Sequence, residues 1–186
     1  MIGFAMTGSF CTISENMNIL RKLINKEYDF LPIMSQSVFN TDTRFGEAER
    51  IRESIIDITN KEIIHTIVQA EALGPRIHLD AMIISPCTGN TLAKIANGIT
   101  DTAVCMAAKA HLRNDKPLII ALASNDALAG NLQNIAKLLS RKNIYFVPMR
   151  QDDPENKPHS LVADFSLLEE TLQNAIKNKR MNRIFI

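Results

Sequence analysis

Five short, nearly continuous apolar runs, separated by amphipathic stretches, constrain the fold of this chain more than any other feature. Runs of this length are typical of strands buried on both faces of a parallel sheet, and the stretches between them predict connecting helices. The alternation therefore predicts an α/β fold: a three-layer α/β/α sandwich around a doubly wound, mainly parallel sheet, Rossmann-like or flavodoxin-like. The predicted strands are residues 2–6, 30–34, 81–85, 118–123 and 144–147.

Apolar spacing and capping residues indicate where the helices lie. One apolar stripe predicts the first helix and consists of Ile13, Met17, Leu20 and Ile24. The sequence Thr59-Asn-Lys-Glu62 matches the capping-box motif and predicts a second helix that ends at Gly74-Pro75. Its apolar side is expected to carry Ile63, Ile64, Ile67 and Val68. Further helices are predicted from residue 90 or 91 to 97, from a cap at Asp101 to 112, over 128–139, and from the capping box Ser166–Glu169 to 177.

Length, charge and cysteine content narrow the class of protein. The chain has 186 residues, 46% hydrophobic and 22% charged, and we expect a single domain over residues 1–186. Its net charge of +1 gives no electrostatic reason to expect nucleic acid or an acidic membrane as a partner. Cys11, Cys87 and Cys105 are widely spaced and form no C-x-x-C motif, so we expect reduced thiols and no metal site. With no signal-peptide pattern at Met1–Met6, the expected location is the cytoplasm.

Small hydroxyl, amide and glycine residues follow four of the predicted strands. The segment Ser85–Thr91 leads straight from a strand into a helix, and Thr7-Gly8-Ser9 does the same near the start of the chain. Such a junction points backbone N–H groups outward with the helix dipole behind them, which suits an anion. Ser35–Ser37 and Ser124–Asp126 follow two other strands. Because ligands of doubly wound sheets bind beyond the carboxyl ends of the strands, we predict one phosphate-bearing ligand at these loops.

Missing motifs narrow the choice of ligand. The first loop lacks the G-x-G-x-x-G pattern of dinucleotide sites, and the chain has no G-x-x-x-x-G-K-[ST] sequence for a nucleoside triphosphate. A mononucleotide with one terminal phosphate, such as FMN, fits hydroxyl-rich loops better.

The three loops at 7–9, 35–38 and 85–91 resemble those of the FMN-binding flavoprotein family, which includes cysteine decarboxylases and flavin prenyltransferases. The resemblance implies a flavoprotein-like domain that holds FMN, with inorganic phosphate as a possible occupant of the same place. By resemblance, the ribityl phosphate would be met by Thr7, Gly8, Ser9, Ser35 and Ser37. The flavin ring would be met by Thr88, Gly89, Asn90 and Thr91, with Pro86 and Ser124 completing the cofactor site. Val38 stands where the family usually has alanine.

Later motifs resemble one subfamily in particular. They are the runs 86–101, 106–114 and 142–158, so the match spans nearly the whole chain. The resemblance implies a second, partner protein similar to nicotinamide-dependent dehydrogenases, on which NAD(P) is expected, a small dicarboxylate substrate, and a trimer-based homo-oligomer. Two alternatives remain open: a free-standing FMN-dependent decarboxylase or prenyltransferase, and a flavin-free scaffold that shapes its partner.

Catalytic residues are not assigned by the sequence. The segment 122–128 lacks the Met-Asn substrate clamp of the cysteine decarboxylases. His65 and His78 are interpreted as structural or surface residues, and Cys11 and Cys87 as packing residues. Lys94 or Arg113 is a hypothetical partner for the substrate carboxylates, with Lys109 one helical turn from Arg113. The polar loop 150–159 is interpreted as a lid, a partner-binding loop or plain surface.

Overall fold

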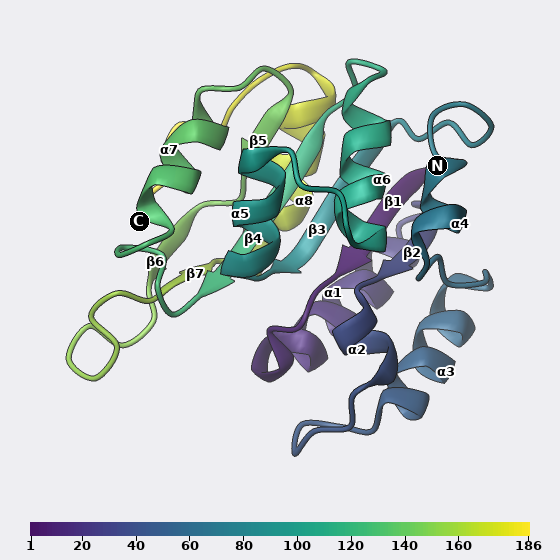
Figure 1. Ribbon diagram of the computed structural model, residues 1–186, viewed down its shortest axis with the longest axis horizontal. Coiled ribbons are helices and arrows are strands. Elements are labelled where there is room, and N and C mark those ends of the chain that lie inside the picture. Colours follow the sequence, from purple (N-terminus) through teal and green to yellow (C-terminus); the bar gives the residue numbers. More distant parts are fainter.

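The computed structural model describes residues 1–186 and shows a seven-stranded sheet between two layers of helices (Figure 1). The strand order is β2-β1-β3-β4-β7-β6, and β5 pairs with the first half of β4. Strands β1 to β5 are parallel, whereas β7 runs antiparallel to both β4 and β6. The predicted α/β sandwich with a mainly parallel sheet is confirmed. The strands are β1 (Ile2–Met6), β2 (Phe30–Met34), β3 (Ala81–Cys87), β4 (Leu118–Ser124), β5 (Ile144–Phe146), β6 (Met149–Gln151) and β7 (Leu161–Ala163).

Helices cover both faces of the sheet. One face packs against α4 (Ile67–Glu71), α5 (Gly89–Asn97), α6 (Ala103–Leu112) and α7 (Leu132–Leu139). The other face packs against α1 (Ile13–Ile24), α3 (Ala48–Thr59) and α8 (Leu168–Ile176). The short elements are α2 (Gln36–Asn40) and the 3-10 turns η1 (Phe10–Thr12) and η2 (Phe165–Leu167).

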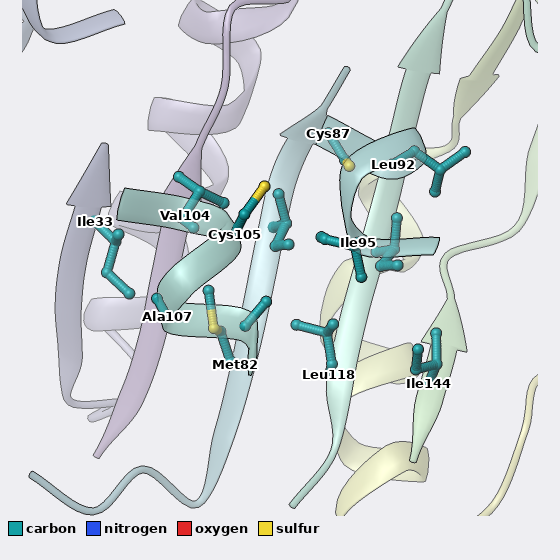
Figure 2. Packing of buried hydrophobic residues seen from close by; sticks show 14 of the residues in the cluster. Ile33, Met82, Cys87, Leu92, Ile95, Val104, Cys105, Ala107, Leu118 and Ile144 are labelled. Atoms are coloured by element: carbon teal, nitrogen blue, oxygen red, sulfur yellow. The ribbon is translucent and has the colours of Figure 1, made fainter. Parts of the chain in front are cut away.

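Two separate hydrophobic clusters fill the spaces between sheet and helices. Figure 2 shows the first, in which Leu92 and Ile95 of α5 lie on the side of β4, and Val104 and Ala107 of α6 lie on the side of β1 and β3. Met82 of β3 is fully buried beneath them. Since both faces of the central strands are covered by apolar side chains, the strands read as continuous apolar runs in the sequence.

The predicted helix from residue 59 to 74 is wrong. Helix α3, which was not predicted, ends at Thr59, and Asn60 then adopts a left-handed conformation with φ 51°. Ile64 instead runs beside β2, donating its N–H to Pro32 O at 3.0 Å. A second, short helix begins after Thr66, which forms a true capping box with Gln69. Pairing with the open edge of β2 outweighed the local capping signal, because unpaired backbone groups on a buried strand are costly.

Three other helix starts differ from expectation. Thr102, not Asp101, caps α6 and accepts a hydrogen bond from Cys105 N at 3.2 Å. Asp164 precedes η2, and α8 follows at Leu168 without a side-chain cap from Ser166. Residues 125–131 form turns, so α7 begins only at Leu132. The β6–β7 hairpin was also not predicted, since three-residue strands carry too little periodicity to be recognised.

None of the helices has the length and apolar composition needed to span a membrane.

His111 is a buried titratable group near the end of α6, and its Nε2–H donates to Pro117 O at 2.9 Å. Burial lowers the pKa of His111 below its ordinary value of 6.5. Unfolding restores the ordinary pKa, so the unfolded chain binds more protons as the pH falls below that value.

We expect the stability contributed by neutral His111 to be complete above about pH 6.5 and to be lost as the pH falls through its lower, folded-state pKa. The free energy of unfolding in urea at pH 7.5 and at pH 5 measures this loss. His111→Gln should flatten the difference, whereas His78→Gln, at an exposed position, should leave it as in the parent chain. Equal pH dependence in the parent and His111→Gln would contradict the prediction.

Candidate functional site

Four loops meet along one edge of the sheet because their strands are neighbours. In the order β2-β1-β3-β4, the parallel strands end at the loops 35–37, 7–9, 85–91 and 124–126. The sequence predicted that these loops share one edge, and the strand order adds that they are consecutive along it. We call these four loops the carboxyl edge. All eleven predicted cofactor-binding residues lie there.

The loops of β1 and β3 are joined by the side chain of Thr7. Thr7 Oγ1 donates to Pro86 O at 2.9 Å and accepts a hydrogen bond from Thr88 N at 2.8 Å. Thr7 is only 1% exposed, so its hydroxyl serves the two loops rather than facing solvent. Thr7 and Pro86 therefore hold the loops of β1 and β3 together.

The loops of β1 and β2 also lie against each other. Ser35 N donates to Met6 O at 3.0 Å, and the hydroxyls of Ser35 and Ser37 are 2.9 Å apart. A Cβ added to Gly8 would lie 3.0 Å from Ser37 Oγ, which shows how closely the two loops approach. Ser37 is exposed and Gly8 and Ser9 are partly exposed, so a hydroxyl-lined, uncharged surface is open here. Hydroxyl and backbone N–H donors of this kind suit a phosphate.

Below the edge, a buried polar pair links α1 to β3. Asn16 and Ser85 are both fully buried, and the Ser85 hydroxyl donates to Asn16 Oδ1. Asn16 Nδ2 donates to Thr12 O at 2.8 Å, which ties η1 to the same strand. Asn16 could not be recognised from the sequence, because an asparagine in a helical pattern is typical of a surface residue.

The third loop begins α5. Thr88 caps the helix by accepting a hydrogen bond from Thr91 N at 3.3 Å. Asn90 is exposed and Thr88 is partly exposed, whereas Gly89 and Thr91 are buried. The side chains of Asn90 and Thr88 are thus the parts of this loop that a ligand can reach.

The fourth loop supplies a carboxylate at the start of α5. Asp126 accepts hydrogen bonds from Ser124 Oγ at 2.6 Å and from Asn131 Nδ2, which lies 2.9 Å from each carboxylate oxygen. A Cβ added to Gly89 would lie 2.8 Å from Asp126 Oδ1 and 2.6 Å from Asn131 Nδ2, and would overlap Ser124 Oγ. The hydrogen bond from Ser124, followed by that from Asn131, lowers the pKa of Asp126, so the group is ionised at neutral pH. We call Ser124, Asp126 and Asn131 the acidic cluster.

This charge distinguishes the two halves of the carboxyl edge. Asp126 is exposed, so a second negative charge about 4 Å from it would be opposed by between about 1 kcal/mol, as in water, and about 4 kcal/mol, as at the effective dielectric constant of a protein surface. A phosphate is therefore disfavoured at the β3–β4 half and suited to the uncharged β1–β2 half. Asp126 lies in one of the loops predicted at this edge but was not named as a cofactor-binding residue, and Asn131 was not predicted at all. A hydrogen-bonded Asp–Asn pair five residues apart leaves no periodic signal in the sequence.

Other predicted candidates lie elsewhere. His65 is not in a helix: its ring stacks on Phe39 with centroids 3.8 Å apart. Cys87 is buried, as a packing residue should be, and burial raises the pKa of its thiol. Cys11 is exposed, so the interpretation of that residue as a buried packing residue is wrong. No three or more His, Cys, Asp or Glu side chains converge in a way that would hold a metal ion.

Of the two cations proposed for the substrate, Lys94 is already paired with a carboxylate, and Arg113 is not brought to the carboxyl edge. Lys94 forms an ion pair with Asp101 at 2.9 Å. Arg113 follows α6 and precedes the start of β4, at the opposite edge of the sheet, about 20 Å away for a strand of this length. There Arg113 and Lys109 line a cleft of about 570 Å³ together with Glu71 and Met106.

The loop 152–160 connects β6 to β7 and projects beyond the body of the molecule (Figure 1, green to yellow-green). Leu128 N donates to His159 O at 2.9 Å, which attaches the loop to the turns after β4. Lys157 pairs with Asp152 at 2.6 Å inside the loop. The segment is thus an ordered projection beside the carboxyl edge, and its role as lid or partner-binding loop stays a prediction.

Comparison with known proteins accounts for this arrangement. A family model described as Flavoprotein matches residues 1–172. The chain belongs to the flavoprotein family. It is 43% identical over 185 residues to the dipicolinate synthase B subunit of Bacillus subtilis strain 168, an alignment that covers 100% of this chain and 92% of that relative. The subfamily that the later motifs resemble is the one to which this relative belongs, and the resemblance is confirmed.

Solved structures agree with the family assignment. A crystal structure of the dipicolinate synthase B subunit from Bacillus halodurans C has a TM-score of 0.91 and 42% identity, covering 100% of this flavoprotein and 95% of that chain. The FMN-dependent cysteine decarboxylase SpaF has a TM-score of 0.68 and 20% identity, covering 94% and 95% of the two chains. At that identity, the likeness to SpaF shows the fold alone.

Proposed function

We propose that this chain is the FMN-binding B subunit of a dipicolinate synthase, with residues 1–186 as one cofactor-binding domain. It would act with a dehydrogenase-like A subunit to form dipicolinate, pyridine-2,6-dicarboxylate, from a dihydrodipicolinate-type precursor during sporulation. The observation that carries the proposal is the full-length relation to the dipicolinate synthase B subunit, 43% identical over 185 residues. The carboxyl edge supports it, because its hydroxyl-lined half suits a phosphate.

The residues of the edge fit FMN in two groups. Gly8, Ser9, Ser35 and Ser37 would hold the ribityl phosphate, and Thr88, Asn90 and the backbone at Gly89 would lie along the flavin ring. FMN, when bound, would supply an acceptor for the two electrons that leave a dihydropyridine ring as it becomes aromatic. NAD(P) is expected on the dehydrogenase-like partner.

We further propose that the protein works in the cytoplasm as a trimer-based homo-oligomer. Its three cysteines are free thiols, which is consistent with a reducing compartment. A flavoprotein of the same fold from Escherichia coli O157:H7, 19% identical with a TM-score of 0.61, is described as a dodecameric decarboxylase. Light scattering of the purified chain measures the oligomer directly, and a monomer would refute this part of the proposal.

We expect the purified protein to be yellow, with the absorption bands of oxidised flavin, and to take up FMN in equimolar amount after the ligand is stripped. Ser37→Asp would place a negative charge beside the phosphate and should weaken FMN binding about tenfold or more, since a like charge in close contact costs at least about 1.4 kcal/mol at a protein surface. Asn182→Asp is the matched control: it adds the same charge at an exposed position near the C-terminus and should bind FMN as the parent does. Fluorescence titration with FMN measures both.

The alternatives predict different results. The first such result is a colourless protein that binds no FMN but still restores dipicolinate formation by its dehydrogenase-like partner. That result would identify the chain as a flavin-free scaffold. Turnover of a decarboxylase or prenyltransferase substrate by this chain alone would identify a free-standing flavin enzyme. Either result would overturn the proposed function.

A further inference from the structure

The acidic cluster contains more side-chain hydrogen bonds to Asp126 than a turn needs. Asp126 uses both carboxylate oxygens to accept hydrogen bonds from Asn131 Nδ2, and Oδ1 also accepts from Ser124 Oγ. Asn131 is itself only 6% exposed, and its Oδ1 accepts a hydrogen bond from Asn134 Nδ2 at 2.9 Å. The carboxylate is therefore held in one orientation by side chains from the end of β4 and the start of α7.

The orientation presses the carboxylate against the first residue of α5. The space that a Cβ would occupy at Gly89 already contains Ser124 Oγ, Asn131 Nδ2 and Asp126 Oδ1. No Lys or Arg forms an ion pair with Asp126. The cluster thus holds a solvent-exposed negative charge, with no ion-pair partner, directly beside the loop that would contact the flavin ring.

We propose that Asp126 is a positioning residue that fixes the turn at Gly89 and sets the electrostatic environment of the flavin ring, favouring oxidised over reduced FMN. This inference rests on the proposed function. Reduction of FMN to its anionic reduced form takes up two electrons and one proton, supplied in a titration by dithionite and water, and leaves one added negative charge on the ring. A fixed carboxylate next to that ring opposes the added charge and therefore lowers the reduction potential.

The test compares the two-electron potential of bound FMN in the parent protein and in variants. In Asp126→Asn, which is nearly isosteric and uncharged, we expect the affinity for reduced FMN relative to oxidised FMN to rise about tenfold, which is about 30 mV for a two-electron couple. Asp126→Ala should shift the potential in the same direction. Asp153→Asn on the loop 152–160 removes a carboxylate that also accepts local hydrogen bonds, and should leave the potential unchanged.

A further variant separates charge from structure. Ser124→Ala removes one hydrogen bond to Asp126 while keeping the carboxylate, so it should loosen the turn without raising the potential. If the parent binds FMN but Asp126→Asn and Asp126→Ala move its potential no more than Asp153→Asn does, the inference is overturned and the proposed function stands. A raised potential in Ser124→Ala equal to that of Asp126→Asn also overturns it. If the parent binds no FMN at all, the proposed function fails and the inference fails with it.

Discussion

Replacing Asn16 with alanine is expected to lower the free energy of unfolding by about 3 kcal/mol, within the range for groups left unsatisfied in a core. Asn16 is fully buried between α1 and β3, where its amide joins the Ser85 hydroxyl to the carbonyl of Thr12. Alanine removes both hydrogen bonds and leaves the fully buried Ser85 hydroxyl without its acceptor. The variant also removes the contact that ties η1 to β3, next to the half of the carboxyl edge where we propose that the phosphate binds.

Urea denaturation followed by far-UV circular dichroism measures the loss. Asn18→Ala is the matched control, because Asn18 lies on the exposed side of the same helix and its replacement should cost less than about 0.5 kcal/mol. Ser85→Ala removes only one hydroxyl and should cost about 1 kcal/mol. A loss in Asn16→Ala no greater than that in Asn18→Ala would show that the buried amide does not join α1 to β3 as described.

Gly89→Ala is expected to weaken FMN binding by at least about tenfold, the equivalent of about 1.4 kcal/mol. The new methyl group would overlap Ser124 Oγ and lie 2.6 Å from Asn131 Nδ2, so the acidic cluster and the turn at residue 89 must move apart. Overpacking of this kind costs about 1–3 kcal/mol, and here the displaced backbone is the part that we propose to lie along the flavin ring.

Two variants make this prediction specific. Gly130→Ala is the matched control, since its Cβ would meet only Asp126 Oδ2 at the ordinary distance of 3.8 Å, and it should bind FMN as the parent does. The double variant Gly89→Ala, Ser124→Ala removes the overlapping hydroxyl and should recover part of the lost affinity. Normal affinity in Gly89→Ala, or equal losses in Gly89→Ala and Gly130→Ala, would mean that the turn is not packed as tightly as the structure shows.

Elements of the fold that depend on neighbouring residues could be predicted from the sequence, whereas those that depend on distant parts of the chain could not. All five apolar runs became strands of the parallel sheet, because a strand buried on both faces needs apolar side chains along its whole length. The helix expected at residues 59–74 failed for a non-local reason. Ile64 pairs with the edge of β2, and the capping-box motif at Thr59 carries no information about that edge.

The candidate site divides in the same way. Loops rich in Ser, Thr and Gly are visible in the sequence because turn and cap geometry demand those residue types locally. The sequence does not show which of these side chains bond other loops and which face solvent. Thr7 joins two loops, whereas Ser37 is exposed. Whether a hydroxyl faces a ligand or another loop depends on which strands are neighbours, and that is decided by the order of the whole sheet.

By itself, the sequence determined the α/β class, the positions of the buried strands and the hydroxyl-rich loops that follow four of them, since each of these follows from side-chain periodicity or turn chemistry within a short stretch of chain. Only the tertiary structure decided that Asn16 meets Ser85 and that Asp126 is held against Gly89. These contacts join residues far apart in the sequence, brought together by hydrophobic burial of the intervening strands and helices.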